Sequence, residues 1–273
     1  MKTLYVTDLD GTLLNREDKL SDFTIETINS LISKGMCFSY ATARSLSSAS
    51  IVTAGLTTDI PVIVYNGVFI LNAKTGAIIS AIRFEEDEKN EVSQYLNSID
   101  IYPLVYAFVN GKERVSWLEG KENEGMLRYI NLRSGDKRLR NIIENCDLYN
   151  GDAFYFTCIG SRIELLPVYE KFKHNIRYTC TFQQELYREE YWCEIMPRKA
   201  TKGNAINKLK EIAQCDRIVS FGDAVNDIPM FSISDECYAV NNAVIELKNI
   251  ATSIIKANDE DGVAHWLEEN FSE

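Results

Sequence analysis

Histidine is almost absent from this chain of 273 residues, which contains only 2. His174 and His265 are isolated from each other, so we expect no histidine-based metal cluster and assign both to structural or solvated positions. Cysteine is present, but its 7 copies are scattered and form no C-x-x-C pair. Such a set fits neither a disulfide framework nor a zinc site. The simplest interpretation is that these cysteines are reduced thiols, which favours a cytoplasmic protein.

Positive charge is also in short supply, with 29 Lys and Arg against 40 Asp and Glu and a formal net charge of −11. This balance repels a nucleic-acid backbone or an anionic membrane surface, so we expect neither as a partner. No apolar run reaches the roughly 18 residues that a membrane span needs. At the start of the chain, Asp8 interrupts the apolar residues before a signal-peptide core is complete, which predicts an unexported, soluble protein.

What the chain does contain is the composition of an ordinary globular protein, 45% hydrophobic and 25% charged. Its two ends alternate short, wholly apolar strand patterns with amphipathic helix patterns, and such alternation predicts an α/β fold with a parallel sheet. The expected strands are 4–7, 36–41, 61–65, 217–221 and 237–240. Ser21 and Ser45 are expected to cap helices, and a later helix is expected over 201–213.

The middle of the chain is less regular. A hairpin pattern over 68–84 leaves the alternation, and the segment that follows mixes helix patterns at 85–96 and about 138–144 with strand patterns at 104–109 and 153–159. We therefore expect an α+β module inserted into the sheet domain. The predicted boundaries are 1–84 for the first core segment, 85–190 for the insertion and 191–273 for the second core segment.

Polar side chains gather where the predicted parallel strands end, which is where ligands bind in such sheets. Asp8 and Asp10 follow the first strand, and Thr42 follows the second. Lys202 stands at the start of a helix, and Gly222-Asp223-Ala224-Val225-Asn226-Asp227 follows a later strand. The sequence thus predicts a cluster of carboxylates with one hydroxyl and one ammonium.

This set of groups suits the transfer of a phosphoryl group. A carboxylate such as Asp8 can attack phosphorus and form an acyl phosphate once charge repulsion is cancelled. Mg²⁺ binds one or two carboxylates, for which Asp8 and Asp223 are the candidates. Lys202 would add a fixed positive charge. Asp10 can act as general acid while its backbone carbonyl stays near the metal.

Each signal has an ordinary alternative. Asp-x-Asp-Gly is also a favoured turn, Thr42 is also a common strand residue, and Asp223 could be a helix cap. Asn66-Gly67 reads equally as a hairpin turn or as a strand-end polar group facing the site. Arg44 reads equally as a substrate ligand or as a charge at the pocket rim. These signals occur together in the expected chain order, and each lies at a predicted strand end or helix start. Their joint appearance favours a functional site over the ordinary alternatives.

These residues resemble a known family. Asp8-Leu9-Asp10-Gly11-Thr12-Leu13, Thr42, Lys202 and Gly222-Asp223-x-x-Asn226-Asp227 are similar to the four ordered motifs of the haloacid dehalogenase-like (HAD) superfamily of phosphohydrolases. Tyr65-Asn66-Gly67 and Glu194-Ile195-Met196-Pro197 resemble its Cof-type subgroup, which carries a type-2 cap. The resemblance covers about 1–84 and 191–273. Where relatives often have Thr-Gly-Arg, this chain has Thr42-Ala43-Arg44, which affects only local geometry.

The resemblance implies a Rossmann-like core with an inserted cap, and a Mg²⁺-dependent phosphatase that acts on sugar phosphates or other small phosphomonoesters through an aspartyl phosphate. Thr42, Lys202 and Asn226 would hold the phosphoryl group, with Arg44 and Asn66 as further substrate ligands. Asp8, the Asp10 carbonyl, Asp223 and Asp227 would form the metal site, Asp227 either directly or by orienting Lys202. Lys199 is a rival for the lysine. Phosphomutase-type transfer and a non-catalytic binder of phosphorylated metabolites are the alternatives.

Overall fold

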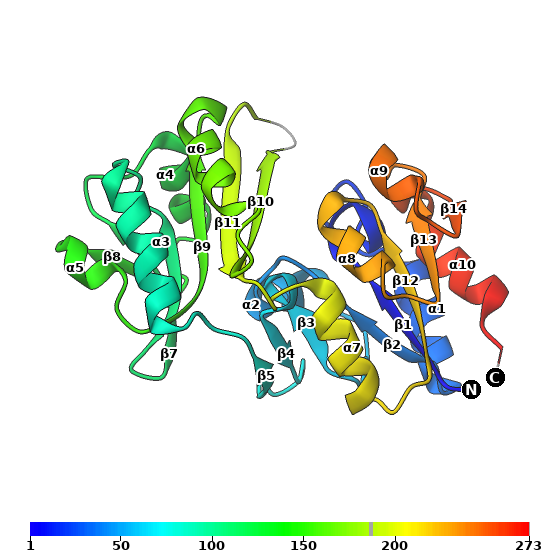
Figure 1. The fold of residues 1–273 in the computed structure, drawn as a ribbon. Helices are drawn as coiled ribbons and strands as arrows, with labels where there is room; N and C mark the ends of the chain where they lie inside the picture. The colour runs from blue at the N-terminus through cyan, green and yellow to red at the C-terminus, as the bar shows by residue number, and fades with distance from the viewer. Residues whose placement is uncertain (186–187, 273) are drawn as a thin grey trace. The chain divides into compact units, whose positions relative to one another are not determined.

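The structure is a computed structural model that describes residues 1–185 and 188–272. The chain forms two compact units, one made of Met1–Ala81 with Ala200–Glu273 and the other of Ile82–Lys199. The second unit is thus an insertion in the first. The first unit is made of the first and last segments of the chain. In Figure 1 its first segment runs from blue to cyan and its last segment from yellow to red.

The first unit is built on a parallel sheet of five strands in the order β14-β13-β12-β1-β2. The strands are β1 (Thr3–Thr7), β2 (Cys37–Tyr40), β12 (Arg217–Gly222), β13 (Glu236–Val240) and β14 (Ser253–Ile255). β1 pairs in parallel with both β2 and β12, so the two sequence segments of the unit meet at the centre of the sheet. These strands are mostly buried because helices cover both faces of such a sheet.

Helices and short turns connect these strands. The helices are α1 (Asp22–Ser33), α2 (Leu46–Val52), α7 (Lys202–Ile212), α8 (Ile228–Phe231), α9 (Ile245–Lys248) and α10 (Gly262–Asn270). Short helical turns are η1 (Leu9–Leu13), η2 (Tyr65–Gly67), η3 (Val225–Asp227) and η4 (Asn258–Glu260). Ser21 and Ser45 cap α1 and α2 through their side chains, as the sequence predicted. α1 packs against α10, and α7 packs against α8.

A small antiparallel sheet of three strands belongs to the same unit. It consists of β3 (Val62–Val64), β4 (Phe69–Leu71) and β5 (Ile78–Ala81). The predicted third strand of the parallel sheet is therefore β3, which pairs antiparallel with β4. A single parallel bridge between Ala41 and Ile63 joins β3 to the edge of the main sheet.

The second unit is a mixed sheet of six strands in the order β10-β11-β9-β6-β7-β8 with helices beside it. Its strands are β6 (Leu104–Val109), β7 (Lys112–Leu118), β8 (Leu139–Ile142), β9 (Asp152–Gly160), β10 (Tyr178–Gln184) and β11 (Tyr191–Pro197). Its helices are α3 (Glu86–Ser98), α4 (Glu124–Leu132), α5 (Asn145–Leu148) and α6 (Arg162–Phe172). A buried cluster that includes Val92, Val105, Phe156 and Ile195 joins the sheet to these helices.

Two expectations differ from the structure. The segment expected to be helical around 138–144 contains β8, which pairs in parallel with β7, so a non-local pairing replaces the local helix. The second boundary between the units lies at Ala200 rather than at 191, because β11 pairs with β9 and β10 and so belongs to the inserted unit.

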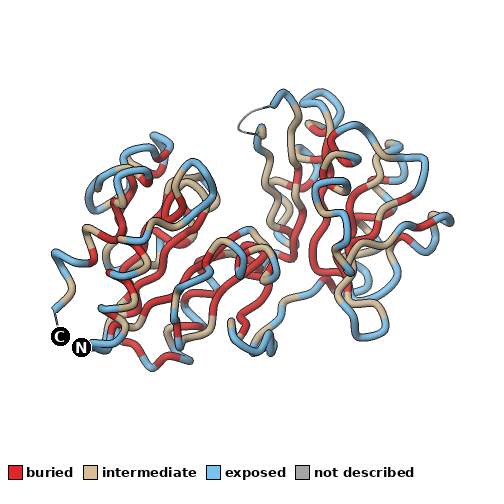
Figure 2. The backbone as a smooth tube through the Cα atoms, turned by 180° about the vertical axis from the view of Figure 1, so that it is seen from behind, coloured by how far each residue is buried: buried red, intermediate tan, exposed pale blue. Residues whose placement is uncertain are grey.

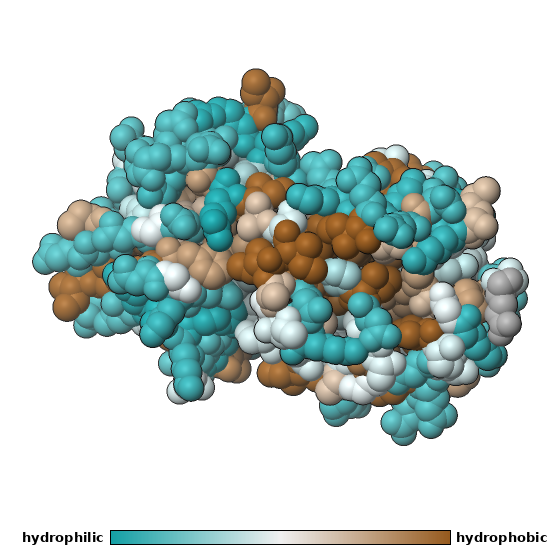
Figure 3. Space-filling view, turned by 90° about the horizontal axis from the view of Figure 1, so that it is seen from below, coloured by the Kyte–Doolittle hydropathy of each residue, from teal (hydrophilic) through white to brown (hydrophobic). Residues whose placement is uncertain are grey.

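Burial follows the strands in both units, where the tube is mostly red, while loops and outer helix faces are exposed (Figure 2). Some large hydrophobic side chains stay exposed, among them Ile51, Ile78 and Ile79. The space-filling view shows hydrophobic areas set within a largely hydrophilic surface (Figure 3). Across the described part of the chain, every helix is too short or too polar to cross a bilayer.

Candidate active site

A buried lysine lies between two aspartates at the carboxyl ends of β1 and β12. Nζ of Lys202 donates to Oδ1 of Asp8 at 2.5 Å and to Oδ1 of Asp227 at 2.7 Å. Lys202 is the first residue of α7, which Thr201 caps by accepting from the amide of Asn204. Only 1% of Lys202 is exposed, so these ion pairs are shielded from water. The structure thus brings Lys202 to the first aspartate, whereas the rival Lys199 lies in the other unit.

The loop after β12 fixes the other acids by its own backbone. Oδ2 of Asp227 accepts from the amides of Asp223 at 3.0 Å and Ala224 at 3.1 Å. A side chain at Gly222 would meet Asp227, since its ideal Cβ would lie 2.7 Å from Oδ2. Glycine at this position therefore lets the loop close tightly around the buried Asp227 carboxylate.

Burial and repulsion act together on these carboxylates. Burial raises the pKa of Asp8 well above its usual range, the charges of Asp227, Asp223 and Asp10 raise it further, and Lys202 opposes the shift. Burial and then the charge of Asp227 raise the pKa of Asp223 to about 7. Burial by itself would lower the pKa of Lys202, but Asp227 and Asp8 outweigh it and raise that pKa. The cluster therefore carries more negative charge than its single lysine balances.

This excess of negative charge fits a cation. Asp8, Asp223 and Asp227 each offer a carboxylate oxygen, and these oxygens lie within 4.8 Å of one another. Hard divalent ions such as Mg²⁺ take carboxylate oxygens as ligands, and the ion's charge would relieve the repulsion that raises the carboxyl pKa values. The donor set and its charge thus suit a divalent metal. The carboxylate of Asp10 is outside this group.

Asp10 is instead held by an arginine. Nε of Arg44 donates to Oδ1 of Asp10 at 3.0 Å and to Oδ2 at 2.9 Å, and Nη2 lies 2.5 Å from Oδ1. The guanidinium also lies near Asp18, with Nη2 to Oδ2 at 3.4 Å. Arg44, predicted as a substrate ligand, is here engaged with two carboxylates, so in this structure it positions Asp10.

Thr42 and the two asparagines lie at the ends of neighbouring elements. The backbone carbonyl of Thr42 accepts from the amide of Asn66 at 2.9 Å, and its Oγ1 accepts from the amide of Arg44 at 3.0 Å. Nδ2 of Asn226 donates to Oδ1 of Asn66 at 3.2 Å. Asn66 is buried and has a φ of 53°, and it lies in η2, the turn that joins the antiparallel strands β3 and β4. It is therefore both a hairpin-turn residue and a polar partner of Asn226, so the two alternatives that the sequence offered hold together. All the predicted site residues therefore lie in one unit.

Three polar residues that sequence reasoning did not assign also touch this cluster. Oγ1 of Thr12 donates to Oδ1 of Asp223 at 3.0 Å, and Nδ2 of Asn242 donates to the carbonyl of Gly11 at 2.7 Å. Asp18 is the second partner of Arg44. Thr12 lies within the Asp-x-Asp-Gly-Thr motif, which was a signal for it. Asn242 and Asp18 carry no local signal, since their contacts depend on loops that meet only in the fold.

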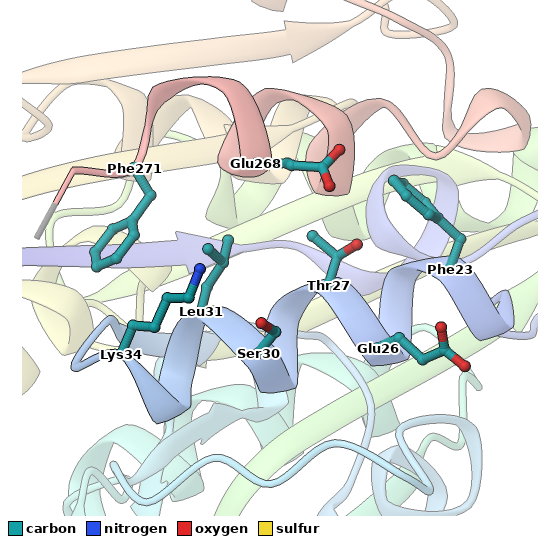
Figure 4. A pocket seen from close by; sticks show the side chains of 8 residues that line it. All are labelled: Phe23, Glu26, Thr27, Ser30, Leu31, Lys34, Glu268 and Phe271. Atoms are coloured by element: carbon teal, nitrogen blue, oxygen red, sulfur yellow. The ribbon is translucent and has the colours of Figure 1, made fainter.

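The same unit contains a separate hollow between α1 and the end of the chain, with a volume of about 400 Å³. Its walls are side chains of α1 and two from the C-terminal segment, Glu268 and Phe271 (Figure 4). The ring of Phe23 at one end packs on that of His265, with centroids 4.6 Å apart. None of the predicted site residues lines this hollow. The ring contact with Phe23 gives His265 a packing position, one of the two positions expected for it.

Comparison with known proteins places this arrangement in a family. The sequence model of the haloacid dehalogenase-like hydrolases matches residues 5–267. The chain is 26% identical to the 5-amino-6-(5-phospho-D-ribitylamino)uracil phosphatase YwtE of Bacillus subtilis, across 97% of this chain and 96% of YwtE. It is 22% identical to YitU of the same organism, a phosphatase of the same name, across 98% and 97% of the two chains.

Solved structures share the fold. The crystal structure of TM0651 from Thermotoga maritima superposes with a TM-score of 0.78 at 23% identity, over 100% of this chain and 99% of that one. The sugar phosphatase BT4131, of HAD subclass IIB, superposes with a TM-score of 0.76 at 18% identity, over 98% of each chain. The parallel-sheet core and the inserted mixed sheet are therefore the fold of these proteins.

Proposed function

The chain belongs to the haloacid dehalogenase-like hydrolase family, in its Cof-type group, and is a phosphatase; we propose that it hydrolyses small phosphomonoesters with Mg²⁺ through a phosphorylated Asp8. The observation that carries this proposal is the buried contact of Lys202 with both Asp8 and Asp227. This contact holds the Asp8 carboxylate in a fixed orientation beside the positive charge of Lys202, within a crowded acidic cluster.

In the proposed reaction, a carboxylate oxygen of Asp8 attacks phosphorus and the bond from phosphorus to the leaving oxygen breaks. The carboxyl group of Asp10 gives its proton to that oxygen, and the alcohol departs. Asp10, now a carboxylate, takes a proton from water as the water attacks the acyl phosphate, which releases phosphate and restores Asp8. Lys202 balances the charge at Asp8 throughout, and Thr42 and Asn226 would hold phosphoryl oxygens.

Asp8, Asp223 and Asp227 would hold the metal, together with the backbone carbonyl of Asp10. When bound, Mg²⁺ would neutralise phosphate charge and orient the substrate toward the nucleophile. Thr12 would keep Asp223 in place through its hydrogen bond of 3.0 Å. Arg44 would act through Asp10, and Asn66 through Asn226.

For the substrate we propose sugar phosphates or related phosphorylated metabolites. YwtE is named for a phosphorylated ribityl compound and BT4131 for sugar phosphates, so both relatives suggest polyhydroxylated phosphate esters. The free state of all seven cysteines fits the cytoplasm, where such metabolites occur. A phosphomutase would differ only in the group that attacks the acyl phosphate, and a binding protein would release no phosphate.

The test is phosphate release from a panel of sugar phosphates, nucleoside monophosphates and an aryl phosphate. We expect turnover with Mg²⁺, none in excess chelator, and weak or no turnover with Ca²⁺, whose looser coordination misplaces the nucleophile. Asp8→Asn should abolish release and prevent formation of the acyl phosphate. Full activity in chelator, or substantial activity of Asp8→Asn, would refute the mechanism. An inert wild type would favour the binding protein.

A further inference from the structure

The inserted unit contains a hollow of about 580 Å³ at the turn end of the β6–β7 hairpin. It is lined by Val109, Asn110, Lys112, Arg114, Leu139 and Arg140. Three of these six side chains are cations and none is an acid. This concentration is notable in a chain whose formal net charge is −11. All six residues belong to the inserted unit, whereas the catalytic aspartates belong to the other.

Strand pairing explains why the cations gather here. β7 and β8 are parallel neighbours, with Ser116 opposite Arg140 in the register. Alternate residues of a strand share a face, so Lys112 and Arg114 lie on the same face of the sheet as Ser116 and hence as Arg140. The cations are thus held on adjacent strands.

These charges are not neutralised by nearby carboxylates. The acids closest in sequence, Glu113 and Asp136, pair with Arg138. Arg114 donates to the backbone carbonyl of Lys137, which carries no net charge. Within residues 1–185 and 188–272, Lys112, Arg114 and Arg140 form no ion pair, and Nη1 of Arg140 is buried with no hydrogen-bond partner.

A buried guanidinium donor without an acceptor is costly, because desolvation of the group is not repaid. Nη1 itself has almost no accessible surface, so an anion in the hollow would instead contact the accessible parts of the three cations and balance their charge. Two guanidinium forks and an ammonium suit the several oxygens of a phosphate group, which arginine binds through paired hydrogen bonds. The volume falls in the range typical of small-molecule sites, and Val109 and Leu139 offer apolar walls. We propose that this hollow is a second anion site, which binds a phosphate-bearing small molecule.

The test is isothermal titration calorimetry of the full chain with pyrophosphate in chelator, since binding then needs no turnover and no metal. The variants are Arg140→Gln and, as a matched control, Arg162→Gln, because Arg162 is exposed on α6 outside the hollow. Any binding at the catalytic site contributes equally to both. We expect Arg140→Gln to weaken pyrophosphate binding about tenfold or more and Arg162→Gln to match the wild type.

Two further measurements keep the test sharp. Arg114→Gln should also weaken pyrophosphate binding. This second variant shows that the loss does not come from a folding defect of Arg140→Gln alone. Circular dichroism checks that each variant is folded. Citrate, a tricarboxylate of comparable charge, should bind at least several-fold more weakly than pyrophosphate. Equal affinity of Arg140→Gln and Arg162→Gln, absence of binding to the wild type, or equal binding of citrate would each overturn the assignment.

Discussion

Nε of Arg44 donates hydrogen bonds to both carboxylate oxygens of Asp10, at 3.0 Å to Oδ1 and 2.9 Å to Oδ2. The side chain of Asp10 is 45% exposed and that of Arg44 is 20% exposed, so the arginine anchors a carboxylate that would otherwise rotate freely at the rim of the site. Paired hydrogen bonds of this kind set orientation as well as energy. The proposed acid is therefore positioned by Arg44, which the sequence left open between a substrate ligand and a charge at the pocket rim.

This contact predicts a particular kinetic effect of Arg44→Gln. Loss of the anchor should lower kcat on a sugar phosphate by about tenfold, part of the roughly 10² to 10⁴ that proton transfer is worth, and should leave KM nearly unchanged. An aryl phosphate needs little protonation of its leaving group and should lose much less. The measurement is kcat and KM for both substrates, with Arg44→Lys expected to recover part of the rate. A rise in KM on both substrates would instead make Arg44 a substrate ligand.

A second prediction distinguishes the two candidate lysines. Lys202→Met leaves Asp8 and Asp227 buried beside each other, and removal of one partner from a buried ion pair costs about 3 to 5 kcal/mol of folding free energy. The rate should fall by about 10² or more, because the charge beside the nucleophile is lost. Lys199→Met changes an exposed residue and should alter neither the folding free energy nor the rate. The comparison uses urea denaturation and kcat/KM, and equal losses in the two variants would contradict the assignment to Lys202.

The third prediction concerns pH and Asp223 in metal-free protein. The pKa of Asp223 is raised to about 7 in the folded state, so the stability of the fold falls as pH rises from the ordinary aspartate pKa towards 7, and the full penalty is present above about 7. As pH falls below 7, Asp223 is protonated in the folded protein but still ionised in the unfolded chain, so the penalty shrinks progressively until the pH reaches the ordinary aspartate pKa. Asp223→Asn should therefore raise the melting temperature at pH 8 and raise it less at pH 6.

The matched control for this effect is Asp59→Asn, since the side chain of Asp59 is 77% exposed. It should give no such pH-dependent gain. Thermal melts in chelator, at several pH values, provide the measurement. Saturating Mg²⁺ should reverse the order of wild type and Asp223→Asn, because only the wild type keeps the full set of ligands. A gain for Asp223→Asn that is the same at pH 6 and pH 8 would show that repulsion is not its cause.

A fourth prediction tests how the site is packed at Gly67. This glycine has a φ of +102°, and an added Cβ would lie 2.2 Å from the carbonyl oxygen of Thr201, directly before Lys202. Gly67→Ala should therefore push on the start of α7, lowering stability by about 2 to 4 kcal/mol and reducing kcat. Gly35→Ala meets nothing within 4 Å at a φ of +96° and should cost only about 1 to 2 kcal/mol with full activity.

Local patterns were enough to predict many elements of this fold. Apolar runs and serine caps predicted β1 and the starting points of α1 and α2, because these features act over a few residues. The helix expected around 138–144 was wrong, since β8 forms through pairing with a strand more than twenty residues away. The stabilisation that comes from pairing with a distant strand leaves no signal in the local sequence pattern.

The sequence by itself determined the parallel sheet, the inserted module and the order of the polar residues at strand ends, since periodicity and motif spacing are properties of the chain. Only the tertiary structure decided which charges touch. Lys202 reaches Asp8 across 194 positions of sequence, Arg44 holds Asp10 and Asp18, and Arg140 is left without an acceptor. Partner choice depends on loops and strands that meet in space, and the strength of each pair depends on burial, which no stretch of sequence specifies.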